Sequence, residues 1–403
     1  MTADIVRGMA SRQTSLLRAS GGDGHRVSFF ELFFDLVYVF AVTQLSHGLL
    51  EHLDLRGAVE TLILLLAVWW AWVYTTWATN WLNPDSTACR LMLIGVMALA
   101  LVMATSIPDA FGDGGLTFAL AYTAIQVGRS SFVLWAVRED PVRRANFQRI
   151  VVWNAAAGGL WIAGGLLSGS ARDVVWIAAL VVDYAAPAIR YLVPGLGRSV
   201  TLEWTVTASY FSERFKLFVI LALGESIIVT GATFSDLEPN LPTVLALASA
   251  FAGSVALWWV YFHRSADAGE EAMDRSGDPG RIARSAYTYS HLPLIAGIII
   301  TAVGDELVIG HPTGQADVAT VLTVLGGPAL FLAGHALFKY AVFGVLSVPR
   351  LVAIALLGAF APVALALPPL VIGMVATAVI VGVAAHETLF HPEATTEAMT
   401  VED

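Results

Sequence analysis

Apolar stretches long enough to cross a lipid bilayer recur along almost the whole chain. Each covers about 17 to 25 residues, the length that an α-helix needs to span the hydrocarbon core. Of the 403 residues, 57% are hydrophobic and only 13% are charged, whereas about a quarter are charged in a typical soluble domain. The sequence therefore predicts an all-α polytopic membrane protein. The twelve predicted spans lie at roughly 29–50, 57–80, 88–107, 117–137, 147–167, 173–193, 211–234, 242–263, 283–305, 318–341, 350–367 and 369–387.

The basic residues predict the orientation of these spans. Nineteen of the 22 Lys and Arg residues lie on the same side of the predicted bilayer as the N-terminal segment. Arg56 and Arg172 lie on the other side, and Arg129 lies within a span. Because Lys and Arg concentrate on the cytoplasmic side of membrane proteins, we expect both termini in the cytoplasm.

The first predicted span has a second copy about 180 residues later. Val27–Leu50 aligns with Phe211–Thr233 when Glu31 is placed on Glu213. The same alignment places Phe33 on Phe215 and Val37 on Val219. The sequence therefore predicts an internal repeat.

This repeat predicts two halves of six spans each. An even number of spans per half lets both copies insert in the same orientation, related by an axis along the membrane normal. The predicted parts are a cytoplasmic N-terminal tail at 1–26, a first six-helix repeat at 27–195, a linker at 196–209, a second six-helix repeat at 210–388 and an acidic C-terminal tail at 389–403.

Four longer motifs follow one another in the chain. They are FFELFFDLVYVFAVTQL at 29–45, SIPDAFGDGGLTFALAY at 106–122, ERFKLFVILALGES at 213–226 and YSHLPLIAGIIITAVGDEL at 289–307. Together they resemble the bacterial low temperature requirement A family, over about residues 25–390. The resemblance implies a multi-pass protein of the bacterial plasma (inner) membrane that contributes to growth in the cold, but it implies no defined chemistry. The chain departs from the family at Tyr210, where the family usually has a histidine.

Two carboxylates in the first span are the first candidates for function. Glu31 and Asp35 lie four residues apart, which places both on one face of the helix. Acids are costly in hydrocarbon, so these should face a helix interior, a watery cavity or a cationic partner. They could bind a cation or relay a proton. The alternative is an interface pair that is capped by Arg26 or anchored to another helix.

Two further charges lie inside predicted spans. Glu225 is more than three turns into the seventh span, near the bilayer midplane, and Gly224 beside it would let another backbone approach. Arg129 keeps its proton under all ordinary conditions, so it needs a carboxylate or carbonyl partner. The candidates are Glu225, Asp35 and Asp183. We favour a functional role for Glu225 and a structural ion pair for Arg129.

Two acids complete the set of candidates. Asp183 lies midway along the sixth span, and Pro187 frees a backbone carbonyl there, as in the broken helices that line cavities. The alternative is that Asp183 only satisfies this irregular backbone. Glu213 opens the seventh span, and because a carboxylate in a first turn suits the helix dipole, capping is its default role.

No metal, cofactor or catalytic residue is predicted. His47, His291 and His335 are scattered over three spans without an HExxH motif, and each is interpreted as a hydrogen-bond donor between helices. The single cysteine, Cys89, excludes an internal disulfide. The sequence also contains no phosphate-binding loop, nucleotide fingerprint, serine triad or nucleic-acid motif.

The sequence favours a transporter or channel-like protein for a small ion, proton or solute over an enzyme. Its pathway is predicted where the first and seventh spans meet, and the predicted polar interior contains Glu31, Asp35, Arg129, Asp183, Glu213 and Glu225. A membrane-embedded enzyme or lipid-acting protein stays open, and clustering of the three histidines would favour it. A structural membrane protein is the third alternative, favoured by full pairing of these charges without a cavity. The lipid bilayer is the predicted partner, nucleic acid is not, and a homo-oligomer stays open.

Overall fold

The computed structural model describes residues 15–18, 27–200, 206–263 and 265–390. Within these residues the chain is helical and contains no β-strand, which confirms the predicted all-α class. Twelve helices of 17 residues or more in this part of the chain correspond one to one to the predicted spans. The proposed cap Arg26 and the acidic segment 391–403 lie outside the described residues.

Eight helical segments among the described residues are long and apolar enough to cross a membrane. These segments contain helices α2, α3, α4, α8, α9, α12, α13 and α15. The other four of the twelve helices are either less apolar or more charged (α5, α6 and α7) or shorter (α14). Length and composition thus support a multi-pass membrane protein.

The chain divides into two compact units. The first contains residues 1–218 and 274–283, and the second contains residues 219–273 and 284–403. The boundary lies inside helix α8, which contributes its first eleven described residues, 208–218, to the first unit. The assignment of two six-helix repeats joined at 196–209 stays a prediction.

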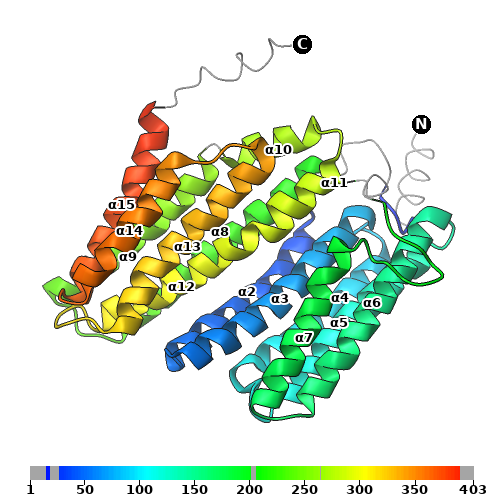
Figure 1. Ribbon diagram of the computed structural model, residues 1–403, viewed down its shortest axis with the longest axis horizontal. Helices are drawn as coiled ribbons and strands as arrows, with labels where there is room; N and C mark the ends of the chain where they lie inside the picture. Colours follow the sequence, from blue (N-terminus) through cyan, green and yellow to red (C-terminus); the bar gives the residue numbers. More distant parts are fainter. Residues whose placement is uncertain (1–14, 19–26, 201–205, 264, 391–403) are drawn as a thin grey trace, which may run out of the picture. The chain divides into compact units, whose positions relative to one another are not determined.

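The first unit is a bundle in which most helices pack against a neighbour along the chain (Figure 1). Helix α2 packs on α3 and α4, α5 packs on α4 and α6, and α6 packs on α7. Helix α3 also contacts α5 and α7, which places it in the middle of this unit. The helices are α2 (Phe29–Glu51), α3 (Leu55–Trp81), α4 (Thr87–Thr105), α5 (Gly115–Ala136), α6 (Pro141–Gly165), α7 (Ser170–Ala188) and the first part of α8 (Ala208–Ser235).

Polar residues just before α2 and α3 explain where these two helices begin. Ser28 and Glu31 form a capping box at the start of α2, in which each side chain accepts a hydrogen bond from the other residue's backbone N–H. Asp54 accepts from the Gly57 N–H at 2.7 Å at the start of α3. Such caps satisfy backbone donors that the first turn of a helix leaves without partners.

The second unit is built mainly from the rest of α8, residues 219–235, and five further long helices. Helix α12 packs along α13, α9 packs along α15, and α14 lies against both α13 and α15. The helices are α9 (Leu241–Phe262), α10 (Ser265–Asp274), α12 (His291–Gly310), α13 (Val318–Phe343), α14 (Val348–Ala364) and α15 (Pro369–Phe390). The short helix α11 (Pro279–Ile282) and the π-helical segment Ala283–Tyr289 precede α12.

Glycines allow α12 and α13 to approach each other at backbone distance. A methyl group added to Gly297 would overlap the Phe331 backbone, and one added to Gly327 would overlap Thr301. Small residues at such contacts are typical of membrane helix pairs, because close packing replaces the hydrophobic effect that is absent in lipid.

Three of the boundaries that differ from the sequence expectation have a visible local cause. Helix α12 begins at His291 rather than near 283, because the preceding residues form the wider turns of a π-helix. Helix α8 begins at Ala208, where the Phe211 N–H already bonds to the Thr207 carbonyl. Pro187 lies in the last turn of α7, so it marks the end of the helix and does not break it midway.

Candidate functional site

The two carboxylates of α2 lie inside the first unit. Glu31 and Asp35 are both 0% exposed, and they lie one turn apart on a helix whose other face is apolar and partly exposed. A buried carboxylate without partners would be strongly unfavourable. The partners of these two groups therefore decide what the site can do.

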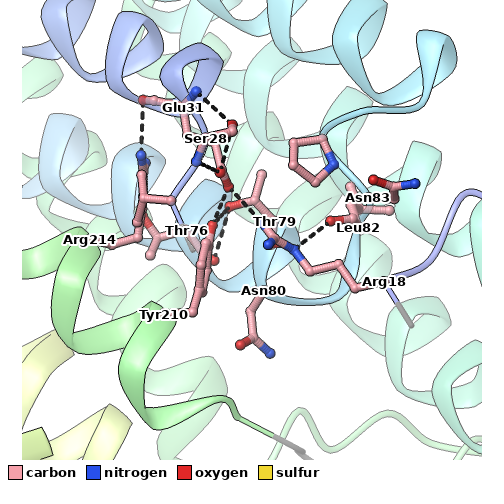
Figure 2. Close-up of polar contacts among 12 residues, drawn as sticks. Arg18, Ser28, Glu31, Thr76, Thr79, Asn80, Leu82, Asn83, Tyr210 and Arg214 are labelled. Atoms are coloured by element: carbon pink, nitrogen blue, oxygen red, sulfur yellow. Dashed lines mark hydrogen bonds and ion pairs between the residues drawn. The ribbon is translucent and has the colours of Figure 1, made fainter. Parts of the chain in front are cut away.

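Glu31 is held by three parts of the chain (Figure 2). Its carboxylate accepts from the Ser28 N–H and hydroxyl, each at 2.8 Å, and from the Arg18 guanidinium at 3.0 Å. The Tyr210 hydroxyl of α8 donates to the same carboxylate, while it lies 2.7 Å from the Thr79 hydroxyl of α3. Arg18 also stacks on the Tyr210 ring, 4.4 Å from its centroid.

Asp35 pairs with Arg214 in a two-pronged geometry. The two guanidinium nitrogens of Arg214 lie 2.8 and 2.7 Å from the two carboxylate oxygens, and Arg214 also donates to the Glu31 carbonyl at 2.9 Å. The Trp72 indole N–H of α3 donates to Asp35 at 2.8 Å. Both side chains of the ion pair are 0% exposed. Such bidentate pairs are the strongest and most directional of the ion pairs that proteins form.

We call this set the paired network, defined by its two acids and the four side chains from outside α2 that bind them: Glu31, Asp35, Arg18, Trp72, Tyr210 and Arg214. Aromatic rings surround it, and Trp72 and Phe215 meet edge to face with centroids 5.0 Å apart. Because the rings exclude water, each charge depends on its partner rather than on solvent. The paired network joins the N-terminal segment, α2, α3 and α8.

Glu213 lies beside this network and not at a helix end. Because α8 begins at Ala208, Glu213 is in the second turn, so the expected first-turn capping role is wrong. Its carboxylate instead accepts from the Val27 N–H at 3.2 Å. It is half-buried, unlike its neighbour Arg214.

Arg129 on α5 has neutral partners. It is 2% exposed, and it donates to the Ala71 carbonyl and the Thr75 hydroxyl of α3, both at 3.2 Å, and to the side-chain oxygen of Gln126. Within the described residues it forms no direct ion pair with Asp35, because that acid is taken by Arg214. The structural ion pair expected for Arg129 is therefore not formed with the first-unit candidates.

Asp183 on α7 likewise has neutral donors. It is 3% exposed, and its carboxylate accepts from the Tyr122 hydroxyl at 2.8 Å and from the Trp161 indole at 3.0 Å. The Gln126 amide donates to the Tyr122 hydroxyl at 2.9 Å. A continuous path of hydrogen bonds therefore runs from Arg129 through Gln126 and Tyr122 to Asp183.

We call these four residues the separated network: Arg129, Gln126, Tyr122 and Asp183. In it a buried cation and a buried anion are connected by two neutral side chains, and every donor points toward the carboxylate. Thr75 on α3 links the two networks, because its hydroxyl accepts from Arg129 and its carbonyl accepts from Thr79, which in turn contacts Tyr210.

The remaining candidates lie apart from these networks. Glu225 is a half-buried residue of α8 in the second unit. Within the described second unit, a methyl group on Gly224 would meet no atom within 4 Å, so no backbone of this unit approaches the glycine closely.

The histidines do not form a three-residue cluster. His47 is exposed on α2, whereas His291 and His335 lie in the second unit and both contact the Tyr261 ring. His291 Nε2 lies 2.8 Å from the Tyr261 hydroxyl. In the part of the chain that the structure describes, no three His, Cys, Asp or Glu residues are grouped as metal ligands.

Several residues of the site were missed by the sequence analysis. Arg18 lies in a polar segment, and its partner Glu31 is in the next helix. The polar pair of Gln126 and Arg129 on α5 carries a signal, because residues three apart face each other on a helix. The position of Tyr210, noted as a departure from the family, places its hydroxyl on Glu31.

Comparison with known proteins supports the family resemblance. The sequence profile described as "Bacterial low temperature requirement A protein (LtrA)" matches residues 26–385. An uncharacterized protein of Rhizobium meliloti (strain 1021), RA0937, is 43% identical over 331 residues, which cover 81% of this chain and 80% of the relative. No solved structure matches the chain.

Proposed function

The chain belongs to the bacterial low temperature requirement A family, and on that premise we propose that it is a transporter or channel-like protein for a small ion or solute. The observation that carries the proposal is the separated network. Arg129 and Asp183 are buried charges that face only neutral side chains in the described first unit. A direct ion pair would stabilise these charges better. Their separation is therefore better explained by a role in transport than by a role in stabilising the fold.

The hydrogen bonds of the separated network define how it would respond to a proton or cation at Asp183. An ionised Asp183 only accepts, so the Tyr122 hydroxyl donates to it and accepts from the Gln126 amide. A protonated Asp183 can donate, which lets the Tyr122 hydroxyl turn away and weakens the alignment of Gln126 with Arg129. Binding at one helix, α7, is thereby coupled to α5 and, through Arg129, to α3.

Glu225 extends the proposal to the second unit. It is a carboxylate inside a helix that is long and apolar enough to cross a membrane. In the proposed mechanism Glu225 is the protonatable group that couples proton movement to the solute, and Glu31, Asp35, Arg129, Asp183 and Glu213 form the polar interior of the first unit.

The test is flux into liposomes that contain the purified protein, with protons and a panel of common inorganic ions as probes. We expect flux above that of empty liposomes, and at least a tenfold loss in Asp183→Asn. Asp113→Asn is the matched control, because Asp113 is exposed in a loop and belongs to neither network. Full flux in Glu225→Gln would exclude Glu225 from the pathway.

A structural membrane protein is the second candidate, and the paired network favours it. Glu31 and Asp35 meet Arg18 and Arg214 at ion-pair distance in a fully enclosed site, as expected of groups that fasten helices together. The two candidates differ in their outcome. A folded protein without flux of any probe would support the structural candidate and contradict transport.

A further inference from the structure

A pocket of about 490 Å³ lies in the second unit, beside the turn that joins α13 to α14. Residues of α10, α13, α14 and α15 form its wall. Its polar lining consists of Lys339, Glu387 and the hydroxyl-bearing residues Ser265 and Ser347. Neither buried network of the first unit contributes to it, so it needs an explanation of its own.

The charges beside the pocket do not balance. Glu387 accepts from both guanidinium nitrogens of Arg350, at 2.7 and 3.1 Å, and from the Lys339 ammonium at 3.3 Å. Two cations therefore share one carboxylate. Among the described residues neither cation pairs with another acid. The cluster keeps one positive charge that a ligand can neutralise.

His335 does not compensate this excess. Its Nδ1 accepts hydrogen bonds from Arg350 at 3.2 and 3.1 Å, which fixes it as a neutral imidazole with the proton on Nε2. Both His335 and Arg350 are 0% exposed. The buried side of the cluster is therefore fixed, and Lys339, with 29% of its side chain exposed, is the group that can meet a ligand.

One helix begins at the same pocket. Ser347 precedes the first residue of α14, and its side chain does not cap the helix. The N-terminus of a helix carries partial positive charge, so this helix end adds to the attraction for an anion. The four acids of α10 do not line the pocket: Asp267, Glu270, Glu271 and Asp274.

Exposed apolar residues form the rim of the pocket. Val345, Leu346 and Val348 line it and are 66%, 59% and 64% exposed. The distribution of Lys and Arg predicts that this turn faces the cytoplasm. An excess cation beside exposed apolar side chains at a membrane surface matches a molecule that has an anionic head and apolar chains.

We propose that this pocket binds the phosphate-bearing headgroup of an anionic phospholipid from the cytoplasmic leaflet. Lys339 contacts the phosphate, the hydroxyls of Ser265 and Ser347 donate to its oxygens, and the rim residues contact the first part of the acyl chains. The bound lipid supplies the negative charge that the cluster of Lys339, Arg350 and Glu387 lacks.

Native mass spectrometry of the full-length protein in neutral detergent tests this proposal. The probes are dioleoylphosphatidylglycerol, dioleoylphosphatidylcholine and potassium phosphate. We expect the anionic lipid to bind, the zwitterionic lipid to bind at least tenfold more weakly, and phosphate not to displace the anionic lipid. Lys339→Gln should weaken binding of the anionic lipid about fivefold, the effect of one basic residue at a membrane surface. This change leaves Glu387 paired with Arg350.

The matched control is Lys216→Gln, which removes the other lysine of the chain and should leave lipid binding unchanged. Val345→Glu is a second test, because it places a negative charge on an exposed rim position and should also weaken binding. If Lys339→Gln does not fold, lipid binding by Val345→Glu tests the proposal instead. Equal binding of both lipids, displacement by phosphate, or unchanged binding in both pocket variants would overturn the proposal.

Discussion

The two buried networks of the first unit contain similar charges in opposite arrangements. In the paired network each carboxylate meets a guanidinium at 3.0 Å or less. In the separated network the carboxylate of Asp183 and the guanidinium of Arg129 are connected only through Gln126 and Tyr122. A direct pair holds helices in one position, because any movement leaves a bare charge. A separated pair can change its protonation or bind an ion with small rearrangements.

The largest expected effect is the loss of the Asp35 carboxylate. Asp35→Asn leaves Arg214 as a buried cation without a carboxylate partner of its own. We expect the free energy of unfolding to fall by about 3 kcal/mol, measured by denaturant titration in detergent micelles. Asp113→Asn, at an exposed site, should change it by less than about 0.5 kcal/mol. A similar small change in both variants would show that the ion pair does not stabilise the fold.

Glu31 allows the ion pair and the helix cap to be separated. Glu31→Gln keeps a side chain that can complete the capping box but loses the charge that binds Arg18, which should cost about 1.5 kcal/mol. Glu31→Ala loses both contributions and should cost about 1 kcal/mol more. Equal unfolding free energies for the two variants would contradict the capping contribution.

Tyr122→Phe breaks the separated network with almost no change of shape. Asp183 then keeps the Trp161 donor, so the loss of stability should be about 1.5 kcal/mol, less than for Asp35→Asn. In the same variant flux into liposomes should fall at least fivefold, because the path from Asp183 to Gln126 is interrupted. Tyr191→Phe is the control, since Tyr191 lies outside both networks. Unchanged flux in Tyr122→Phe would argue against the proposed coupling.

The smallest expected effect on the free energy of unfolding is that of Asp317, an acid outside both networks. It shows what an ordinary helix cap contributes, for comparison with the buried acids. Asp317 accepts from the Thr320 N–H at 2.7 Å at the start of α13, and this hydrogen bond lowers the pKa of Asp317. Asp317→Ala should therefore cost about 1 kcal/mol. Because the folded-state pKa is the lower one, the contribution is present above the unfolded pKa of about 3.9 and is lost as pH falls through the folded value. The same difference in unfolding free energy between the wild-type chain and Asp317→Ala at pH 3 and at pH 7 would contradict this assignment.

The helices were predictable from sequence because apolar runs of bilayer length have few alternative folds. The burial of Glu31 and Asp35 was also expected, since two acids in such a run need enclosure. Their partners were not, because Arg214 is about 180 residues away along the chain and Arg18 lies in a polar segment. Pairing of this kind depends on how the helices pack, which composition and spacing do not determine.

Arg129 illustrates a different difficulty. The sequence predicted a carboxylate or carbonyl partner, because a buried guanidinium cannot lose its charge, and it favoured an ion pair. The structure satisfies this group with an amide, a hydroxyl and a carbonyl, and Gln126 lies only one turn away on the same helix. The three-residue spacing of Gln126 and Arg129 therefore already indicated this contact. The position of Pro187 at the end of α7, in contrast, depended on where the chain turns, which the sequence did not determine.

The central claim is that the paired network stabilises the fold and the separated network serves transport. The most direct measurement is flux per folded protein for Asp183→Asn and Asp35→Asn reconstituted side by side with the wild-type chain. We predict that Asp183→Asn loses at least tenfold in flux while its unfolding free energy changes by less than about 1 kcal/mol. Asp35→Asn should lose stability and keep most of the flux of its folded fraction. Unchanged flux in a folded Asp183→Asn would contradict the claim.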